Sequence, residues 1–201
     1  FFTERDVVAE ERRSRIDNPA QGKLYEAFVG KAFDHSPYKI VVIGPAKDIQ
    51  AYTPKKAKEF YDKYYIPGRL VVALVGNFDL DYAESIMRKY FSSIPQKPNP
   101  SKEIKKQEVG AKEFPREVIV EDVDQPRFYL GYHRPTHPDP DDIVFDVIQA
   151  VLCDGRTSRM YKQFVLTKKA AFVSCYAAIP GGRLDSMFTF YSMPLPGHTN
   201  K

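Results

Sequence analysis

Two glutamates near the start of the chain, Glu4 and Glu11, are spaced so that both could contribute to one functional site. They lie two helical turns apart, so both carboxylates point from one face of a helix. The surrounding stretch, TERDVVAEERRSRIDNP (3–19), predicts such a helix, with Thr3 as its cap and Asn18-Pro19 as its end. We expect the rest of this helix surface to be exposed to solvent. It carries Arg5, Arg12, Arg13 and Arg15.

A carboxylate pair of this kind has two interpretations. It is either a solvated, ion-paired helix surface, or one metal ligand with a supporting carboxylate beside it. Spacing alone favours the solvated surface, because a metal site needs more ligands than two.

Several segments, taken in their order along the chain, resemble one protein family. ERDVVAEERR is followed by DNP, LYEAF and HSPY, and GRTSRMYKQFVLTKKAAFVSCY follows further on. This order resembles the pitrilysin, insulinase and mitochondrial-processing-peptidase family of zinc metallopeptidases, and in particular its bacterial branch with two-lobed subunits. In that family an H-x-x-E-H motif and a Glu-x6-Glu pattern on a later helix serve the zinc site. The resemblance implies that Glu11 is the third zinc ligand and that Glu4 supports the site.

The H-x-x-E-H motif does not occur in these 201 residues. The resemblance would place it several dozen residues before Phe1, so we expect the chain to be an internal part of the enzyme. The general base is then expected upstream. We therefore expect the 201 residues alone to bind no catalytic zinc and to cleave nothing.

A second family feature, an Arg-x6-Tyr pair that binds the peptide backbone, is replaced in this sequence. The resemblance places it on VLTKKAAF, where Val165 and Phe172 stand. Neither side chain can donate a hydrogen bond to a peptide. The resemblance implies a peptide substrate and a dimer, and the replacement points to a non-identical homologous subunit as the partner.

Two histidines with an i, i+4 spacing, His133 and His137, suggest a metal pair on a helix. Pro135 lies between them and Pro138 follows them, and proline breaks a helix at such positions. The sequence therefore predicts no metal site there.

The overall composition excludes some classes of function. The chain is 43% hydrophobic and 28% charged, as in ordinary globular proteins. Its net charge of +4 and its lysine-rich stretch at 97–112 are too weak to predict nucleic-acid binding. No apolar run is long enough for a membrane span. The only two cysteines, Cys153 and Cys175, stand in apolar stretches and are predicted to be free buried thiols. We expect a bacterial protein of the cytoplasm or periplasm.

Hydrophobic periodicity and capping residues predict the remaining elements. Further helices are expected at about 20–34, 54–65, 80–90, 141–153 and 158–165, the fourth with a core face of Val144, Val147, Ile148, Val151 and Leu152. Strands are expected at 70–76, 117–123, 127–132, 170–179 and 184–193, the first of them buried on both faces.

These elements predict an α/β (α+β) fold, in which mixed sheets have helices packed chiefly on one face. The resemblance implies parts of two homologous lobes. Residues 1–94 are then the C-terminal part of the first lobe, 95–115 a proline- and lysine-rich linker, and 116–201 the N-terminal part of the second lobe.

The function predicted for the complete protein is zinc-dependent endopeptidase cleavage of peptides held in an enclosed chamber. Two alternatives stand beside it. One is a structural or partner subunit of the same family that has lost the chemistry. The other is an unrelated α/β binding module, in which Glu11 is merely a surface charge.

Overall fold

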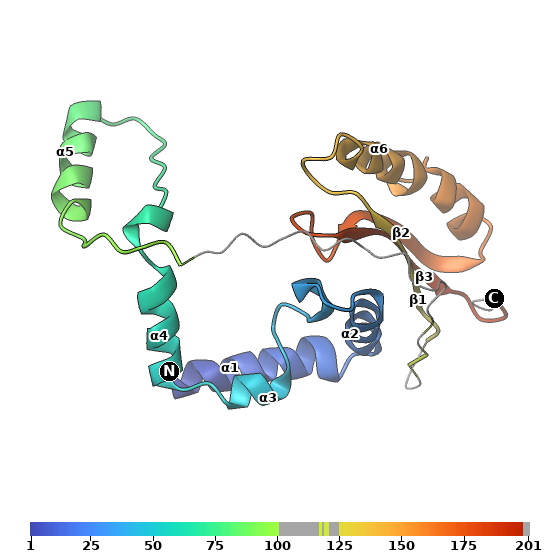
Figure 1. Ribbon diagram of the computed structural model, residues 1–201. Coiled ribbons are helices and arrows are strands. Elements are labelled where there is room, and N and C mark those ends of the chain that lie inside the picture. Colours follow the sequence, from blue (N-terminus) through green and yellow to red (C-terminus); the bar gives the residue numbers. More distant parts are fainter. Residues whose placement is uncertain (101–116, 118, 121–124, 199–201) are drawn as a thin grey trace. The chain divides into compact units, whose positions relative to one another are not determined.

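The computed structural model describes residues 1–100, 117, 119–120 and 125–198 (Figure 1). The chain divides into two compact units. One consists of Phe1 and Ala51–Ile104, and the other of Phe2–Gln50 and Lys105–Lys201.

The first unit is built on two helices, α4 (Pro54–Tyr64) and α5 (Leu80–Phe91), with a short 3₁₀ turn at Pro67–Arg69 between them. Both helices begin where the sequence predicts, because each has a side-chain cap. The Thr53 hydroxyl accepts a hydrogen bond from the backbone N–H of Lys56 at 3.2 Å. The Asp79 carboxylate accepts one from the N–H of Tyr82 at 2.7 Å.

The prediction of a strand at 70–76 is wrong. This segment is irregular and largely exposed, with Val71 92% and Val75 96% accessible to solvent. A strand needs a neighbour for its backbone N–H and C=O groups, and none of the strands in the described part of the chain pairs with these residues. The stretch therefore keeps its apolar side chains in water.

The predicted linker falls mostly outside the described residues. Residues 95–100 are irregular, and the described ranges resume at 117. The strand predicted at 117–123 also lies largely outside them. The domain boundaries that the sequence suggests therefore stay predictions.

The second unit begins with α1 (Phe2–Arg12), which continues as one π-helical turn, η1 (Arg13–Asp17). The helix ends before Asn18-Pro19, as predicted. It starts at Phe2, however, so Thr3 lies inside the first turn and is not the cap. α2 (Ala20–Ala32), the 3₁₀ turn η2 (Pro37–Lys39) and α3 (Ala46–Gln50) follow.

Three antiparallel strands form the sheet of this unit, in the order β1-β3-β2. They are β1 (Phe128–Arg134), β2 (Ala170–Ile179) and β3 (Ser186–Pro194). All three coincide closely with predicted strands. The register sets Tyr129 opposite Tyr191, so alternate residues of each strand share one face.

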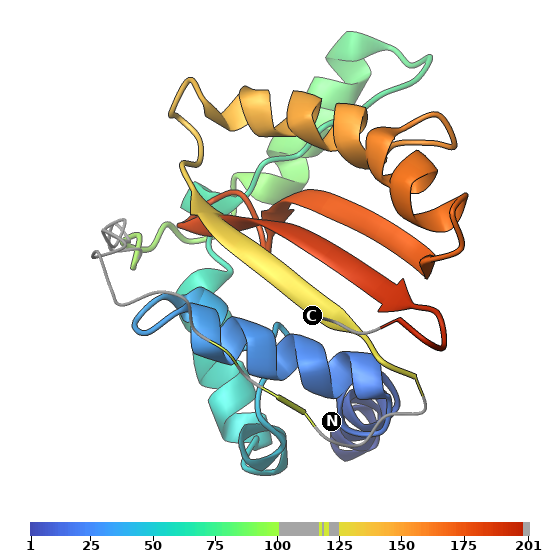
Figure 2. The same cartoon turned by 90° about the vertical axis from the view of Figure 1, so that its right-hand side faces the viewer.

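Helices cover both faces of this sheet: α6 (Asp142–Cys153) lies on one side and α2 on the other (Figure 2). On the α2 side, the rings of Phe28 and Tyr129 stack with their centroids 5.1 Å apart. On the α6 side, Phe145 lies 5.8 Å from Phe188. The predicted α/β class is confirmed, but the predicted mixed sheet with helices chiefly on one face is not: the described sheet is antiparallel and has a helix on each face.

The predicted core face of α6 is only partly right. Val144, Val147 and Val151 are 46%, 60% and 48% exposed. Phe145 and Gln149 face the sheet instead, and the Gln149 side chain accepts a hydrogen bond from the N–H of Ala177 at 2.6 Å. α6 is apolar on most of its circumference, so periodicity could not specify which side packs.

The prediction of free thiols is also wrong, because Cys153 and Cys175 form a disulfide. Packing of α6 on β2 brings the two Cα atoms within 5.8 Å, the usual distance for a bridged pair. The bond joins the end of the helix to the middle of the strand. The helix predicted after Ser158 is confirmed as a short one that is mainly π-helical, η4 (Tyr161–Val165).

Candidate metal site

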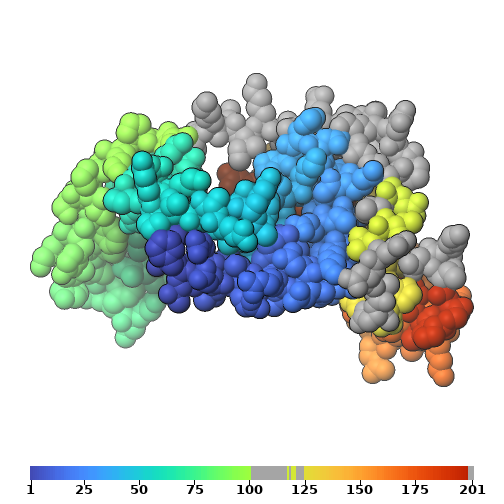
Figure 3. Space-filling model, turned by 90° about the horizontal axis from the view of Figure 1, so that it is seen from below, coloured from blue at the N-terminus to red at the C-terminus, as the bar shows by residue number. Residues whose placement is uncertain are grey.

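α1, which carries both glutamates, lies at the surface and is coloured dark blue in Figure 3. Glu4 is exposed, and the Glu11 side chain is 39% exposed. A rise of 1.5 Å per residue separates their positions by about 10 Å along the helix axis. The two carboxylates are therefore too far apart to hold one ion jointly, and only one of them can be a direct ligand.

Glu11 is paired with a cation on its own helix. Its carboxylate lies 2.7 Å from the guanidinium of Arg15, which is 74% exposed. An exposed pair of this kind contributes little to stability. Glu11 can therefore exchange this partner for a metal ion at low cost.

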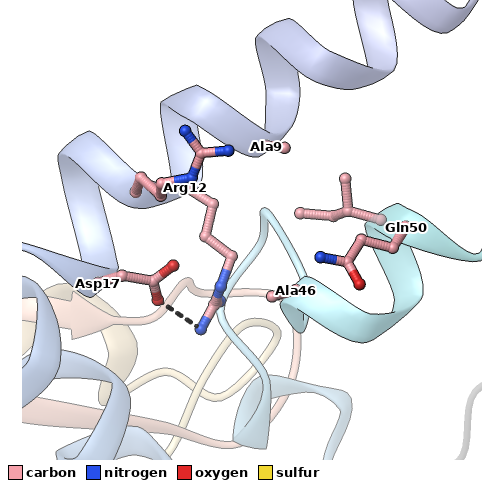
Figure 4. Close-up of a pocket in the computed structure, with 7 residues that line it drawn as sticks. Ala9, Arg12, Asp17, Ala46 and Gln50 are labelled. Carbon is pink, nitrogen blue, oxygen red and sulfur yellow. Dashed lines mark ion pairs between the residues drawn. The ribbon is translucent and has the colours of Figure 1, made fainter.

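The next residue, Arg12, is buried, which corrects the prediction that all four arginines of the helix are solvated. It is 7% exposed, and its guanidinium binds both carboxylate oxygens of Glu26 at 2.9 and 3.0 Å. It also donates to the carbonyl oxygen of Gly44 at 2.7 Å and lies 3.1 Å from Asp17 (Figure 4).

Neighbouring charges and burial shift the pKa of Arg12 in opposite directions. The hydrogen bonds to Glu26 raise the pKa of Arg12, burial opposes this effect, and the negative charges of Glu26 and Asp17 add to the rise. Arg12 is therefore a permanent cation that ties α1 to α2 and to the turn before α3.

The π-helical turn after α1 explains how Asp17 reaches Arg12. In an α-helix, residues five apart point about 140° away from each other. A π-helical turn closes i to i+5 instead, as the hydrogen bond from the N–H of Asn18 to the carbonyl of Arg13 shows at 2.9 Å. α2 packs directly on this turn, since a Cβ at Gly22 would lie 2.6 Å from the Cα of Ile16.

A cavity of about 50 Å³ adjoins Arg12, and Figure 4 shows its lining. The lining residues are Ala9, Arg12, Arg13, Asp17, Ala46, Ile49 and Gln50. This volume holds a few water molecules and is far smaller than a peptide site. The cavity beside Arg12 is therefore too small to be a substrate pocket.

α1 offers only part of the ligand set that a zinc ion requires. A catalytic zinc site takes three protein ligands, and Glu11 offers one oxygen donor. Among the residues with a described position, no group of three His, Cys, Asp or Glu side chains could hold a metal ion. α1 can thus supply one such ligand, and the described residues do not complete the set.

The two histidines do not lie on a helix, as the neighbouring prolines predict. His133 lies in β1, where its Nε2 is 3.2 Å from the carbonyl oxygen of Ala32 and its ring meets Phe33 edge-on. His137 lies in the turn that follows the strand.

Val165 and Phe172 lie on neighbouring elements, at the end of η4 and near the start of β2. Phe172 is 44% exposed, and its ring lies 5.9 Å from that of Tyr191. Both side chains are apolar, so this surface has no side-chain hydrogen-bond donor at either position.

Sequence reasoning missed Arg12 as the anchor of α1. Its partners Glu26 and Gly44 are 14 and 32 residues away, beyond the reach of helical spacing. One local signal was present. Val8 and Ala9 precede Arg12 by one helical turn, so Arg12 lies on the less polar side of α1.

No helix in the described ranges has the length and apolar character that a membrane crossing requires.

Comparison with known proteins places the chain among peptidases. A family model described as the peptidase M16 inactive domain matches residues 51–201. The zinc protease PqqE of Helicobacter pylori is 33% identical over 177 residues, which are 85% of this chain and 39% of that protein. The mitochondrial-processing peptidase subunit beta of Saccharomyces cerevisiae is 30% identical over 105 residues, which are 48% of this chain and 21% of that protein.

A solved structure has the same fold. The crystal structure of a protease from Helicobacter pylori aligns with a TM-score of 0.78 and 26% identity, over 98% of this chain and 48% of that one. The chain therefore spans less than half the length of these relatives. Since the family model covers well over half of its residues, the chain belongs to the M16 peptidase family, as the order of its motifs predicts.

Proposed function

We propose that this chain is part of a zinc-dependent metalloendopeptidase subunit and that Glu11 supplies one of its zinc ligands. Membership of the M16 family and the name of the Helicobacter pylori relative, a zinc protease, support this proposal. The observation that carries it is the position of Glu11. Its side chain is partly exposed, at 39%, whereas the next residue, Arg12, is buried and held by Glu26.

Each residue of α1 has a limited task in this proposal. Bound zinc would polarise the scissile carbonyl and activate a water molecule. The Glu11 carboxylate would reduce the net charge of the ion and fix one corner of its coordination. Glu4 would accept a hydrogen bond from another ligand and so hold that ligand's orientation. The remaining ligands and the general base come from outside these residues, and peptides are cleaved in an enclosed chamber.

The test is substitution of Glu11 in the full-length protein. Glu11→Gln keeps the size of the side chain and removes its charge, so we expect at least a tenfold loss of zinc affinity and of peptide hydrolysis. Glu10→Gln is the matched control, because Glu10 is the preceding, exposed residue of the same helix. Full zinc content and full activity in Glu11→Gln would show that Glu11 is a surface charge.

A second candidate is a subunit that keeps the fold without the chemistry. The apolar pair Val165 and Phe172 favours it, as does the match to a model described as an inactive domain. The yeast relative is named as a subunit, so an assembly of non-identical chains has a counterpart among the relatives. A homodimer that uses backbone donors is the other possible assembly. Membership of the family excludes an unrelated binding module.

The compartment is part of the same proposal. The Helicobacter pylori relatives support a bacterial protein. The Cys153–Cys175 bond favours the periplasm over the cytoplasm, because disulfides persist in oxidising compartments.

A further inference from the structure

We infer that Arg12 is a positioning residue for the metal ligand Glu11, an inference that rests on the proposed function. Arg12 does not touch the ion in this arrangement. It follows Glu11 directly and is buried, while the Glu11 side chain is partly exposed. Fixing the backbone at Arg12 therefore fixes the direction in which the Glu11 carboxylate leaves the helix.

The guanidinium of Arg12 joins α1 to two segments that are distant in the sequence and to the end of the adjoining turn η1. It forms a two-oxygen pair with Glu26 on α2, a hydrogen bond with the Gly44 carbonyl, and an ion pair with Asp17 at the end of η1. Arginine suits this task because its planar group offers several donors in fixed directions. A lysine would keep the charge but lose the two-pronged geometry.

The helix changes from α to π geometry immediately after Arg12. Where this change occurs decides how the end of α1 is rotated, and π-helical turns cost stability unless other contacts hold them. The Arg12–Asp17 pair spans the turn, and α2 packs against it at Gly22. Without the pair, the turn can relax toward α geometry, which would rotate α1 relative to α2 and so move Glu11.

A purely structural role for Arg12 makes a different prediction. Loss of an anchor would then lower the melting temperature and leave the metal site unchanged in the molecules that stay folded. A positioning role requires that zinc affinity and coordination geometry change, even in a variant that folds normally.

The experiment measures metal binding by four variants of the full-length protein: Arg12→Lys, Arg12→Ala, Glu26→Gln and Arg13→Ala. Zinc affinity is obtained by competition with a chelator, and the visible absorption of the cobalt(II)-loaded protein reports coordination geometry. Arg13→Ala is the matched control, since Arg13 is the next residue, carries the same charge and has a 60% exposed side chain.

We expect the two Arg12 variants and Glu26→Gln to weaken zinc binding 10- to 100-fold and to change the cobalt spectrum, as residues that orient metal ligands do. Arg13→Ala should stay within twofold of wild type. If Arg12→Ala does not fold, Arg12→Lys and Glu26→Gln carry the comparison.

Two other results are distinguishable. Unchanged zinc affinity and cobalt spectra in folded Arg12→Lys and Glu26→Gln, with binding lost in Glu11→Gln, would overturn the inference and leave the proposed function standing. Normal zinc binding in Glu11→Gln itself would overturn both.

Discussion

At the scale of single residues, Gly22 shows what close helix packing demands. Because α2 lies against the carbonyl and Cα atoms of η1, a methyl group at position 22 would meet backbone that cannot rotate away. We predict that Gly22→Ala lowers the free energy of unfolding by about 2 kcal/mol or more, measured by denaturant unfolding of the full-length protein.

Gly30 provides the control for this substitution. It lies on the same helix, and a Cβ there would have no atom within 4 Å. Gly30→Ala should be neutral or stabilise the protein by up to about 1 kcal/mol, because alanine favours the helix. Equal effects of the two substitutions would contradict the packing of α2 on η1.

The half-buried Tyr129 of β1 predicts a loss of stability at high pH. Burial raises the pKa of Tyr129 to about 12, from an ordinary value of 10.0. Between these values the unfolded chain releases the phenolic proton and the folded protein keeps it. Stability is therefore fully present below pH 10 and falls as the pH rises toward 12.

The size of this effect is about 1 kcal/mol after allowance for the partial exposure of the ring. Tyr129→Phe removes the hydroxyl group and should lose less stability than wild type between pH 10 and pH 12, as measured by thermal unfolding. Parallel losses in both proteins would show that Tyr129 keeps an ordinary pKa.

The sequence predicted part of the candidate site at this scale. The shared face of Glu4 and Glu11 follows from helical geometry alone, so spacing was sufficient. The burial of Arg12 depends on Glu26 and Gly44, which only the folded chain brings near. The role of Glu11 as a ligand stays a prediction.

At the scale of elements, the disulfide between α6 and β2 is the feature whose loss is simplest to measure. The bond closes a loop with a sequence separation of 22 residues, which corresponds to about 3 kcal/mol of stabilisation in the chain-entropy model. We predict that reduction lowers the melting temperature of the full-length protein. A Cys153→Ala/Cys175→Ala double variant should start from the lower value and not respond to reductant.

Peptide mapping without reductant checks this prediction directly. A cross-linked pair of peptides containing Cys153 and Cys175 is expected. Two separate peptides with free thiols, from protein purified without reductant out of an oxidising compartment, would contradict the bond.

Elements with local signals were predicted well, and those that depend on partners were not. The starts of α4 and α5 follow from Thr53 and Asp79, whose caps act within one helical turn. The stretch 70–76 has strong β-forming side chains but no paired strand in the described residues. The side of α6 that packs was decided by the sheet, because the helix is apolar on most sides.

At the scale of the whole molecule, the apolar pair at Val165 and Phe172 predicts dependence on a second subunit. A peptide carbonyl buried against such a surface would lose a hydrogen bond, at a cost of about 1–3 kcal/mol. We expect the full-length protein alone to cleave unstructured peptides poorly, and a non-identical homologous subunit to restore cleavage.

A gain-of-function variant sharpens this test. Val165→Arg/Phe172→Tyr supplies both donors and should raise cleavage by the single protein roughly tenfold or more, as that free energy implies. Robust cleavage by the wild-type protein without any second subunit would rule out this dependence.

The exposed stretch at 70–76 also affects how this chain behaves in solution. Its seven residues, LVVALVG, contain no charge and no proline. Such segments self-associate into intermolecular β-structure when nothing covers them. In preparations where the stretch is uncovered, solubility will therefore be limited by these few residues more than by the net charge of +4. Lysine substitutions at Val71 and Val75, its two most exposed valines, should therefore raise the solubility of the chain without disturbing a packed core.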